Sequence, residues 1–149
     1  MEIRREIVLP CPPAEAWRVL TDWERQADWM LDADEVRVVS ERRAGVGVRL
    51  AVRTRLFQVP AFTEPMEVVA WEPPHRLAIA HGGLVEGSGI WELDAVDGGT
   101  RFVWTEGVRL RVPAVGELAA RCYAPVMRRL MGRAQRGLRR YVIASGPDR

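Results

Sequence analysis

The sequence predicts an α+β fold in which a curved antiparallel sheet packs around one long C-terminal helix. Between positions 36 and 110 the chain repeats strand-length segments separated by Gly and Pro, a pattern typical of an antiparallel sheet. After Pro113, apolar residues recur at three- and four-residue steps, the spacing of an amphipathic helix: Val115, Leu118, Cys122, Val126, Leu130, Ala134, Leu138 and Tyr141. A solitary helix needs a large partner surface, so we expect the sheet to grip it around a cavity.

Length and composition indicate one globular domain over residues 1–149. The chain is 48% hydrophobic and 28% charged, close to an average soluble domain, which argues against disorder. No apolar run approaches the roughly 18 residues of a membrane-spanning helix. Because the N-terminus enters a strand-like segment at once, there is no room for a signal peptide, and we expect a cytoplasmic protein. Cys11 and Cys122 are far apart and are expected to be inert thiols.

The N-terminal segment is predicted to be a strand followed by a short helix. Residues 2–9 alternate apolar and polar side chains, as in a half-buried strand, and end at Pro10. Pro12 and Pro13 then open a helix that continues through residues 14–20, because proline is tolerated in a first helical turn.

A second short helix is predicted directly after the first. Thr21 and Glu24 have the spacing of a capping box, which opens a helix that ends near Trp29. The turn that follows is acidic, and we expect a solvated loop rather than a metal site because the D-x-D-x-D-G spacing of a calcium loop is missing. Its acidic residues are Asp28, Asp32, Asp34 and Glu35.

Six further strands bring the predicted sheet to seven. Even positions of the longest early strand are apolar, whereas Arg49, Arg53 and Arg55 occupy its odd face and should meet water. Residues 82–87 are rich in glycine and are expected to form a flexible connection. The predicted strands are 36–39, 46–56, 62–71, 76–81, 90–95 and 100–110.

Turn chemistry sets the register of the last hairpin. Asp97-Gly98-Gly99 suits a tight turn, and the register that follows pairs Leu93 with Phe102, Trp91 with Trp104, and Gly89 with Glu106. Even positions of the last strand then face the helix. If His81 lies beside Gly89, it shares a row with Glu106 at roughly 10 Å between backbones, and the two side chains can meet directly or through a water or a ligand.

The order of these elements resembles the START-like superfamily, in particular its bacterial polyketide cyclase/dehydrase-type members. The resemblance implies a helix-grip fold with an apolar cavity between sheet and helix. Members bind lipids, polyketides, hormones or quinone-like molecules, and a minority catalyse cyclisation or dehydration. The segments that carry it are Pro12-Pro13-Ala14-Glu15-Ala16-Trp17, Asp22-Trp23, Trp29-Met30, Trp71-Glu72-Pro73-Pro74-His75-Arg76-Leu77 and Gly98-Gly99-Thr100-Arg101-Phe102.

The favoured function is binding or carriage of a hydrophobic small molecule, such as a lipid, a polyketide or a quinone-like compound. Glu106 and His81 are the candidate polar anchor, although they could also merely satisfy each other. The candidate ligand-binding residues are Trp91, Trp104, Glu106, His81, Phe62, Met66, Phe57, Trp29, Tyr123 and Met127.

A cyclase- or dehydratase-like enzyme is the alternative, with Glu106 and His81, and Glu64 besides, as acid/base groups. Nucleophilic catalysis has little support because Ser88 is not in a G-x-S-x-G elbow. Two histidines are too few to indicate a metal site, and no phosphate-cradling glycine motif indicates a nucleotide, so no cofactor is expected.

The C-terminal helix carries two further features. Pro125 should kink it, because proline removes a backbone hydrogen bond and clashes with the preceding turn. Its arginines predict a solvated face paired to neighbouring carboxylates, or alternatively a surface for nucleic acid or an anionic membrane. They are Arg121, Arg128, Arg129, Arg133, Arg136, Arg139 and Arg140.

Overall fold

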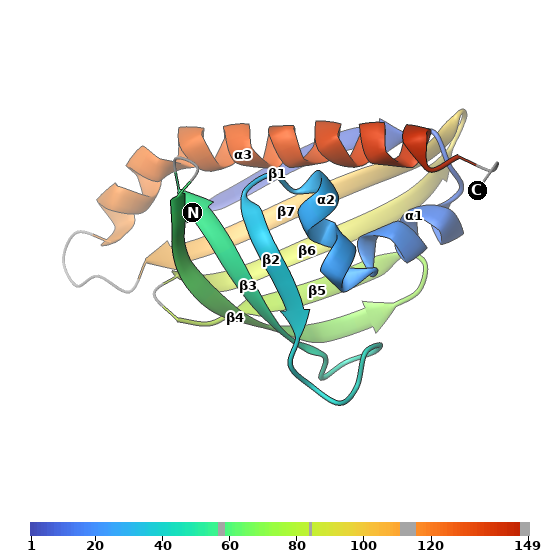
Figure 1. Ribbon diagram of the computed structural model, residues 1–149. Coiled ribbons are helices and arrows are strands. Elements are labelled where there is room, and N and C mark those ends of the chain that lie inside the picture. The colour runs from blue at the N-terminus through green and yellow to red at the C-terminus, as the bar shows by residue number, and fades with distance from the viewer. Residues whose placement is uncertain (57–58, 84, 111–115, 147–149) are drawn as a thin grey trace.

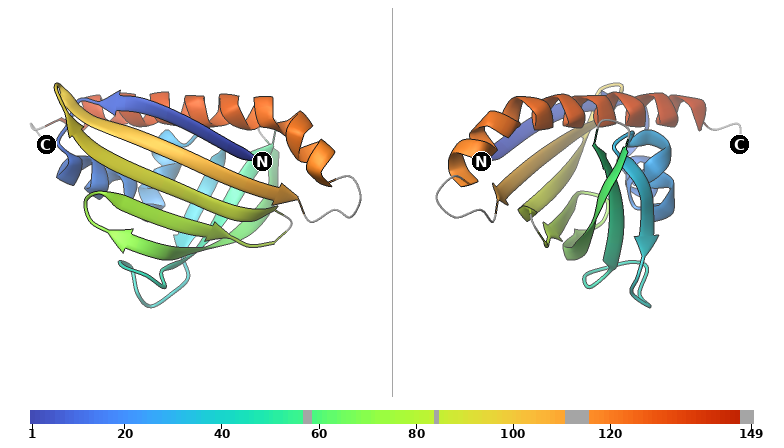
Figure 2. Two further views of the ribbon diagram at one scale, coloured as in Figure 1. Left: turned by 180° about the vertical axis from the view of Figure 1, so that it is seen from behind. Right: turned by 60° about the vertical axis from the view of Figure 1, so that its left-hand side comes forward.

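The computed structural model describes residues 1–56, 59–83, 85–110 and 116–146 (Figure 1). Within them, seven strands form one antiparallel sheet in the order β1-β7-β6-β5-β4-β3-β2, and a long helix lies along its concave side, as predicted. Figure 2 shows the sheet curving beneath this helix, with the two short helices closing one end. The strands are β1 (Glu2–Leu9), β2 (Ala33–Val38), β3 (Arg49–Leu56), β4 (Val59–Glu72), β5 (Arg76–His81), β6 (Val85–Val96) and β7 (Gly99–Leu110).

The first short helix, α1 (Pro13–Leu20), begins where the two prolines predict it. The prediction of a capping box at Thr21 and Glu24 is wrong. Thr21 terminates α1 instead of opening the next helix, because its hydroxyl donates a hydrogen bond to the carbonyl of Trp17 at 2.8 Å. Glu24 forms an ion pair with Arg43 rather than capping a backbone N–H. The chain continues as a 3-10 turn, η1 (Trp23–Arg25), and a single helical turn, α2 (Gln26–Trp29).

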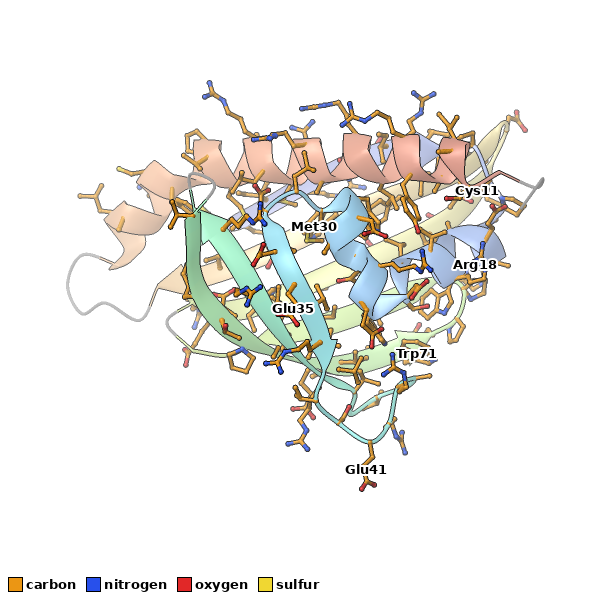
Figure 3. The ribbon with its side chains drawn as sticks, viewed as in Figure 1. Cys11, Arg18, Met30, Glu35, Glu41 and Trp71 are labelled. Atoms are coloured by element: carbon orange, nitrogen blue, oxygen red, sulfur yellow. The ribbon has the colours of Figure 1, made fainter. Side chains whose placement is uncertain are left out.

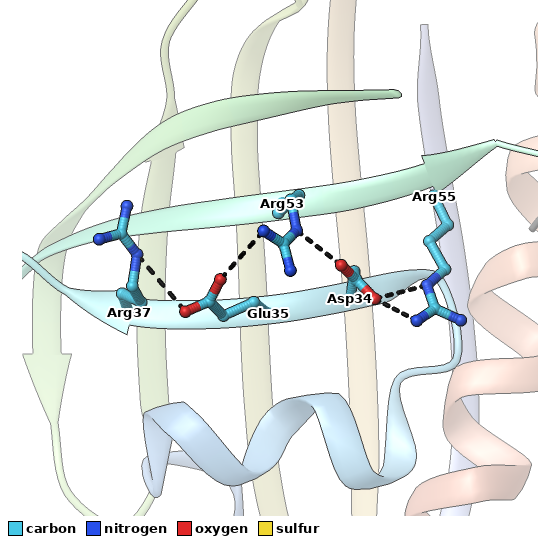
Figure 4. Close-up of polar contacts among 5 residues, drawn as sticks. All are labelled: Asp34, Glu35, Arg37, Arg53 and Arg55. Carbon is cyan, nitrogen blue, oxygen red and sulfur yellow. Dashed lines mark hydrogen bonds and ion pairs between the residues drawn. The ribbon is translucent and has the colours of Figure 1, made fainter. Parts of the chain in front are cut away.

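The predicted acidic loop is divided among three elements: Asp28 lies in α2, Asp32 in the turn that follows, and Asp34 and Glu35 in β2. A register shift in the β2–β3 pairing lies between Ala33 and Glu35, so Asp34 is the extra residue of a bulge. Asp34 and Glu35 both pair with arginines of the outer face, while Ala33 faces inward (Figure 4). Arg53 links the two acids, with its Nε atom 2.6 Å from Oδ2 of Asp34 and Nη1 3.4 Å from Oε2 of Glu35.

The predicted alternation of buried and exposed side chains is confirmed from Val48 through β3. Val48, Leu50 and Val52 are buried, whereas the arginines of the odd face are exposed. The exception is Val46, which was predicted to start this strand but lies in the preceding turn and is 52% exposed.

The hairpin register predicted for β6 and β7 is confirmed at Leu93–Phe102, Trp91–Trp104 and Gly89–Glu106. The predicted flexible connection over 82–87 is too long, because β6 already begins at Val85. The register predicted for β5 is also wrong by two residues. His81 lies opposite Gly87, and Gly89 lies opposite Ile79. The two-residue turn Asp97-Gly98 fixes the β6–β7 register, whereas five residues separate His81 and Gly87, the last pair of β5 and β6, and constrain that register less.

The long helix α3 (Gly116–Ala144) buries a different stripe from the predicted one in its first half. Leu118 is 67% exposed, and Cys122 and Val126 are also exposed. The inward side chains there are those of Ala119, Tyr123 and Met127, one residue further along. From Ala134 onwards the predicted stripe holds, with Leu138 buried and Tyr141 half-buried. Val115 lies outside the described residues.

α3 continues through Pro125, and its first turns are tilted relative to the remainder, as Pro125 predicts (Figures 1 and 2). The two ends of the helix differ in what they cover. Leu138 and Val142 pack into the hydrophobic core, whereas the sheet-facing residues from Ala119 to Ala134 cover the space described below. Both cysteines are free, and burial together with the Glu15 charge raises the pKa of the Cys11 thiol to about 11, with Arg18 opposing.

Candidate functional site

A cavity of about 430 Å³ lies between the sheet and the first half of α3. This volume is within the range of roughly 300–1,000 Å³ typical of small-molecule sites. Most of the wall is apolar, with side chains from the α2–β2 region, the sheet and α3. The apolar wall consists of Met30, Ala33, Val52, Phe62, Met66, Trp104, Val108, Ala119, Met127, Leu130, Met131 and Ala134. Figure 3 shows Met30 at the end of α2, beneath α3.

Seven of the ten candidate residues predicted from the sequence line this cavity: His81, Glu106, Trp104, Phe62, Met66, Tyr123 and Met127. Trp91 and Trp29 do not line it and lie deeper in the core. Phe57 lies outside the described residues.

The tryptophans form a rigid support behind the cavity. Trp104 lines the cavity and makes an edge contact with Trp91 at 6.0 Å between ring centroids. Trp91 in turn packs against Trp29 at 6.4 Å. Alternation places Trp91 and Trp104 on one face but does not reveal which of the two borders empty space. Trp91 therefore supports the cavity wall from behind, through its contact with Trp104.

Glu106 is the best-defined polar group of the site. Its side chain is 6% exposed, and each of its oxygens has a partner. The indole N–H of Trp104 donates to Oε2 at 2.8 Å. Nε2 of His81 lies 2.7 Å from Oε1, although its N–H bond is not aimed along that line, so we regard this contact as an ion pair rather than a well-aligned hydrogen bond.

Gly89 makes this pairing possible. Glu106 on β7 and His81 on β5 are separated by β6, where Gly89 lies opposite Glu106 and diagonal to His81. A Cβ atom at position 89 would lie 2.9 Å from Oε2 of Glu106 and 3.5 Å from Nε2 of His81. The missing side chain thus lets two residues on non-adjacent strands meet, as the sequence suggested, even though the predicted β5 register was wrong.

Glu64 on β4 extends this polar group across the sheet. His81 lies opposite Met66, so Glu64 is diagonal to it on the same face. Burial raises the pKa of Glu64, with the His81 charge opposing and the Glu106 charge adding to the rise. For His81, burial lowers the pKa, but the contact with Glu106 and the charges of Glu106 and Glu64 outweigh it, and the net pKa is raised. These directions favour a protonated His81.

Asp32 is a cavity residue that the sequence analysis placed in a solvated loop. It lines the cavity from the turn before β2, and burial raises the pKa of its carboxyl, with Arg133 opposing. Across the cavity, the pKa of Tyr123 is raised by burial and by the charges of Asp32 and Glu64. Asp32 differs from Asp34 because it lies in the turn before β2, outside the alternation of the strand, and alternation alone does not show where the strand begins.

The arginine face of α3 points away from the sheet, and Figure 3 shows nitrogen-tipped side chains projecting from this outer side. All seven arginines are exposed. The predicted pairing to neighbouring carboxylates is not found, since no ion pair joins them to an acid in the described part of the chain.

Two further properties concern only the described residues. No group of three or more His, Cys, Asp or Glu side chains there is arranged to hold a metal ion. None of the helices in these ranges has the length and apolar character needed to cross a bilayer.

A seven-stranded antiparallel sheet that closes on one long helix, with a cavity between them, defines the helix-grip class of START-like proteins. Within that class, residues 1–142 match the family described as polyketide cyclase / dehydrase and lipid transport, and the chain belongs to this family. A relative in Mycobacterium tuberculosis strain ATCC 25618 / H37Rv, the uncharacterized protein Rv2574, is 27% identical over 95% of this chain and 84% of its own length.

Solved structures share the fold at low sequence identity. The crystal structure of TTHA0849 from Thermus thermophilus superimposes with a TM-score of 0.82 and 22% identity, covering 98% of this chain and 99% of that one. The Zhui aromatase/cyclase from Streptomyces sp. R1128 does so with a TM-score of 0.77 and 14% identity, covering 95% and 93%. At these identities the likeness concerns the fold alone.

Proposed function

We propose that this protein binds a hydrophobic small molecule in the cavity between the sheet and α3. The observation that carries the proposal is a cavity of about 430 Å³ with mostly apolar walls and a buried polar pair, Glu106 and His81, in which Glu106 is held by a hydrogen bond from Trp104. Apolar walls supply affinity, and a few fixed polar groups orient the ligand. The family description, which includes lipid transport, supports the same class of ligand.

Filling the cavity is expected to abolish binding. Ala134 lines the cavity on α3, and Ala134→Phe places a ring in the space that a ligand would occupy. Native mass spectrometry of protein purified from its host, or titration with the neutral fluorophore N-phenyl-1-naphthylamine, should show a ligand bound to the unchanged protein and at least about a tenfold loss in the variant, since tenfold corresponds to only about 1.4 kcal/mol.

The matched control is Ala144→Phe, which adds the same ring at an exposed position near the end of the same helix. It should leave binding unchanged. Equal binding by Ala134→Phe and the unchanged protein would locate the ligand elsewhere and remove the proposal.

A cyclase- or dehydratase-like enzyme is the second candidate. Such a reaction needs one group that takes a proton and one that gives it. His81 and Glu106 meet inside the cavity, and Glu64, whose pKa is raised, lies on the same face of the sheet. Conversion of a retained compound over time, detected by mass spectrometry and lost in Glu106→Gln, would favour the enzyme, whereas a stable complex would favour carriage.

The arginine face is a third, separate proposal: contact with an anionic membrane, which would help a carrier to load its cargo. Changing Arg133, Arg136 and Arg140 to Gln should reduce sedimentation with phosphatidylserine vesicles at low salt, because exposed cations are attracted to anionic headgroups. Binding to RNA instead of vesicles would redirect this proposal to nucleic acid, and no effect on either would end it.

A further inference from the structure

The side chains that line the cavity include more acidic groups than basic ones. Three carboxyl groups line it, those of Asp32, Glu64 and Glu106, whereas no arginine does, and His81 is the one basic lining residue in the described part of the chain. His81 is matched to Glu106. The other two acids therefore face the cavity without a cation of their own in the wall.

Asp32 and Glu64 also lack hydrogen-bond donors. Within the ranges that the structure describes, neither carboxyl accepts a side-chain or backbone hydrogen bond, and neither forms an ion pair within 4 Å. Arg133 acts on Asp32 only as a charge, from an exposed position outside the lining. Partly buried carboxyls without donors are costly, and a ligand that supplies donors removes that cost.

The two acids belong to one polar region. The hydroxyl of Tyr123, on α3, lies within electrostatic reach of both, and Glu64 is within reach of His81 and Glu106. Because Asp32, Glu64 and Tyr123 line one cavity, a ligand head placed near Tyr123 is within electrostatic reach of both carboxyls, while its apolar body lies against the methionines and Phe62.

From this arrangement we infer that the cavity selects hydrophobic amines, with the protonated amine between Asp32 and Glu64, and rejects hydrophobic anions. The inference deepens the proposed function and rests on it. An ammonium group donates charge-assisted hydrogen bonds to carboxylates, which are stronger than those of a neutral hydroxyl. A carboxylate or phosphate head would be brought into an apolar site that already holds two uncompensated acids, with repulsion little screened there.

The raised pKa values of both acids agree with this arrangement. In the empty cavity, burial holds each carboxyl in its protonated form to a higher pH than usual. A bound ammonium favours the ionised forms and should therefore lower both pKa values, which a bound alcohol of the same length has no charge to do.

The test uses three probes with one apolar body: decylamine, decanol and decanoic acid, each titrated at pH 7.5 against bound N-phenyl-1-naphthylamine. We expect decylamine to displace the fluorophore at a concentration about tenfold below that of decanol, and decanoic acid to be the weakest. In the double variant Asp32→Asn, Glu64→Gln, decylamine should fall to the level of decanol, while decanol itself stays unchanged.

The control is Glu67→Gln, the same change on the same strand at an exposed position, which should preserve the preference for the amine. Decanoic acid binding as well as decylamine would overturn the inference, as would an amine preference that persists in the double variant. In both cases decanol still binds, so the proposed function survives. Failure of the fluorophore and of all three probes to bind would instead remove the proposed function, and the inference with it.

Discussion

Replacing Gly137 by Ala is expected to destabilise the protein by about 2–3 kcal/mol, the cost of overpacking a tight site. A Cβ atom at position 137 would lie 2.3 Å from the carbonyl oxygen of Trp29 and 3.3 Å from its carbonyl carbon. These are backbone atoms of a residue that is 1% exposed, so α3 must lift from α2 to admit the methyl group. Helix propensity alone predicts the opposite sign, since Ala is favoured over Gly by about 1 kcal/mol.

Urea denaturation of the two proteins measures this difference in the free energy of unfolding. Gly132→Ala, in the same helix, is the matched control. Its nearest neighbours are the side-chain ends of Arg5 and Arg136, at 3.1 to 3.3 Å, which can move more cheaply than backbone. It should change stability by less than about 1 kcal/mol. Stabilisation by Gly137→Ala would show that α3 does not approach Trp29 this closely, and the position of α3 over the cavity would have to be revised.

Glu106→Gln is expected to lower both the pKa of His81 and the stability of the protein, by about 3 kcal/mol at pH 6, the low end of what breaking a buried ion pair costs. Gln keeps the shape and an acceptor for the indole of Trp104 but removes the negative charge. Burial then dominates at His81 and disfavours its charged form.

The effect should depend on pH in a defined direction. Because the folded pKa of His81 is raised above its ordinary value of 6.5, its pairing stabilises the protein fully below pH 6.5 and less as the pH rises through the folded pKa. The difference in unfolding free energy between the two proteins should therefore be largest at acidic pH and shrink towards pH 9. A difference that does not change with pH would contradict this account.

NMR titration of the imidazole carbons follows His81 directly, because the chain has only one other histidine, His75. His75 lies at the turn between β4 and β5, near the carbonyl of Leu93, and does not line the cavity. The midpoint of the His81 resonance should shift in Glu106→Gln. A His81 midpoint that is the same in both proteins would mean that the pair is not formed in solution.

Local sequence predicted those parts of the site that depend on neighbouring residues. The turn at Gly98 and Gly99, both with positive φ, sets the pairing of β6 with β7 and thereby puts Trp104 and Glu106 on the inward face. Alternation on β5 puts His81 on that face too. Register errors of two residues preserve the face of each side chain, which is why the Glu106–His81 contact could be predicted from an incorrect β5 register.

Alternation and turn signals thus predict most of the elements, the inward faces of the strands and the polar pair. Packing in three dimensions settles which inward residues border empty space. Trp91 and Trp104 share a face, yet only Trp104 reaches the cavity. On α3 two adjacent stripes have helical spacing, and the sheet covers the one with Tyr123 and Met127. Asp32, in the turn before β2, lines the cavity, whereas Asp34, the bulge residue of β2, pairs with arginines on the outer face. Each of these choices depends on packing between segments distant in sequence, and no local periodicity encodes it.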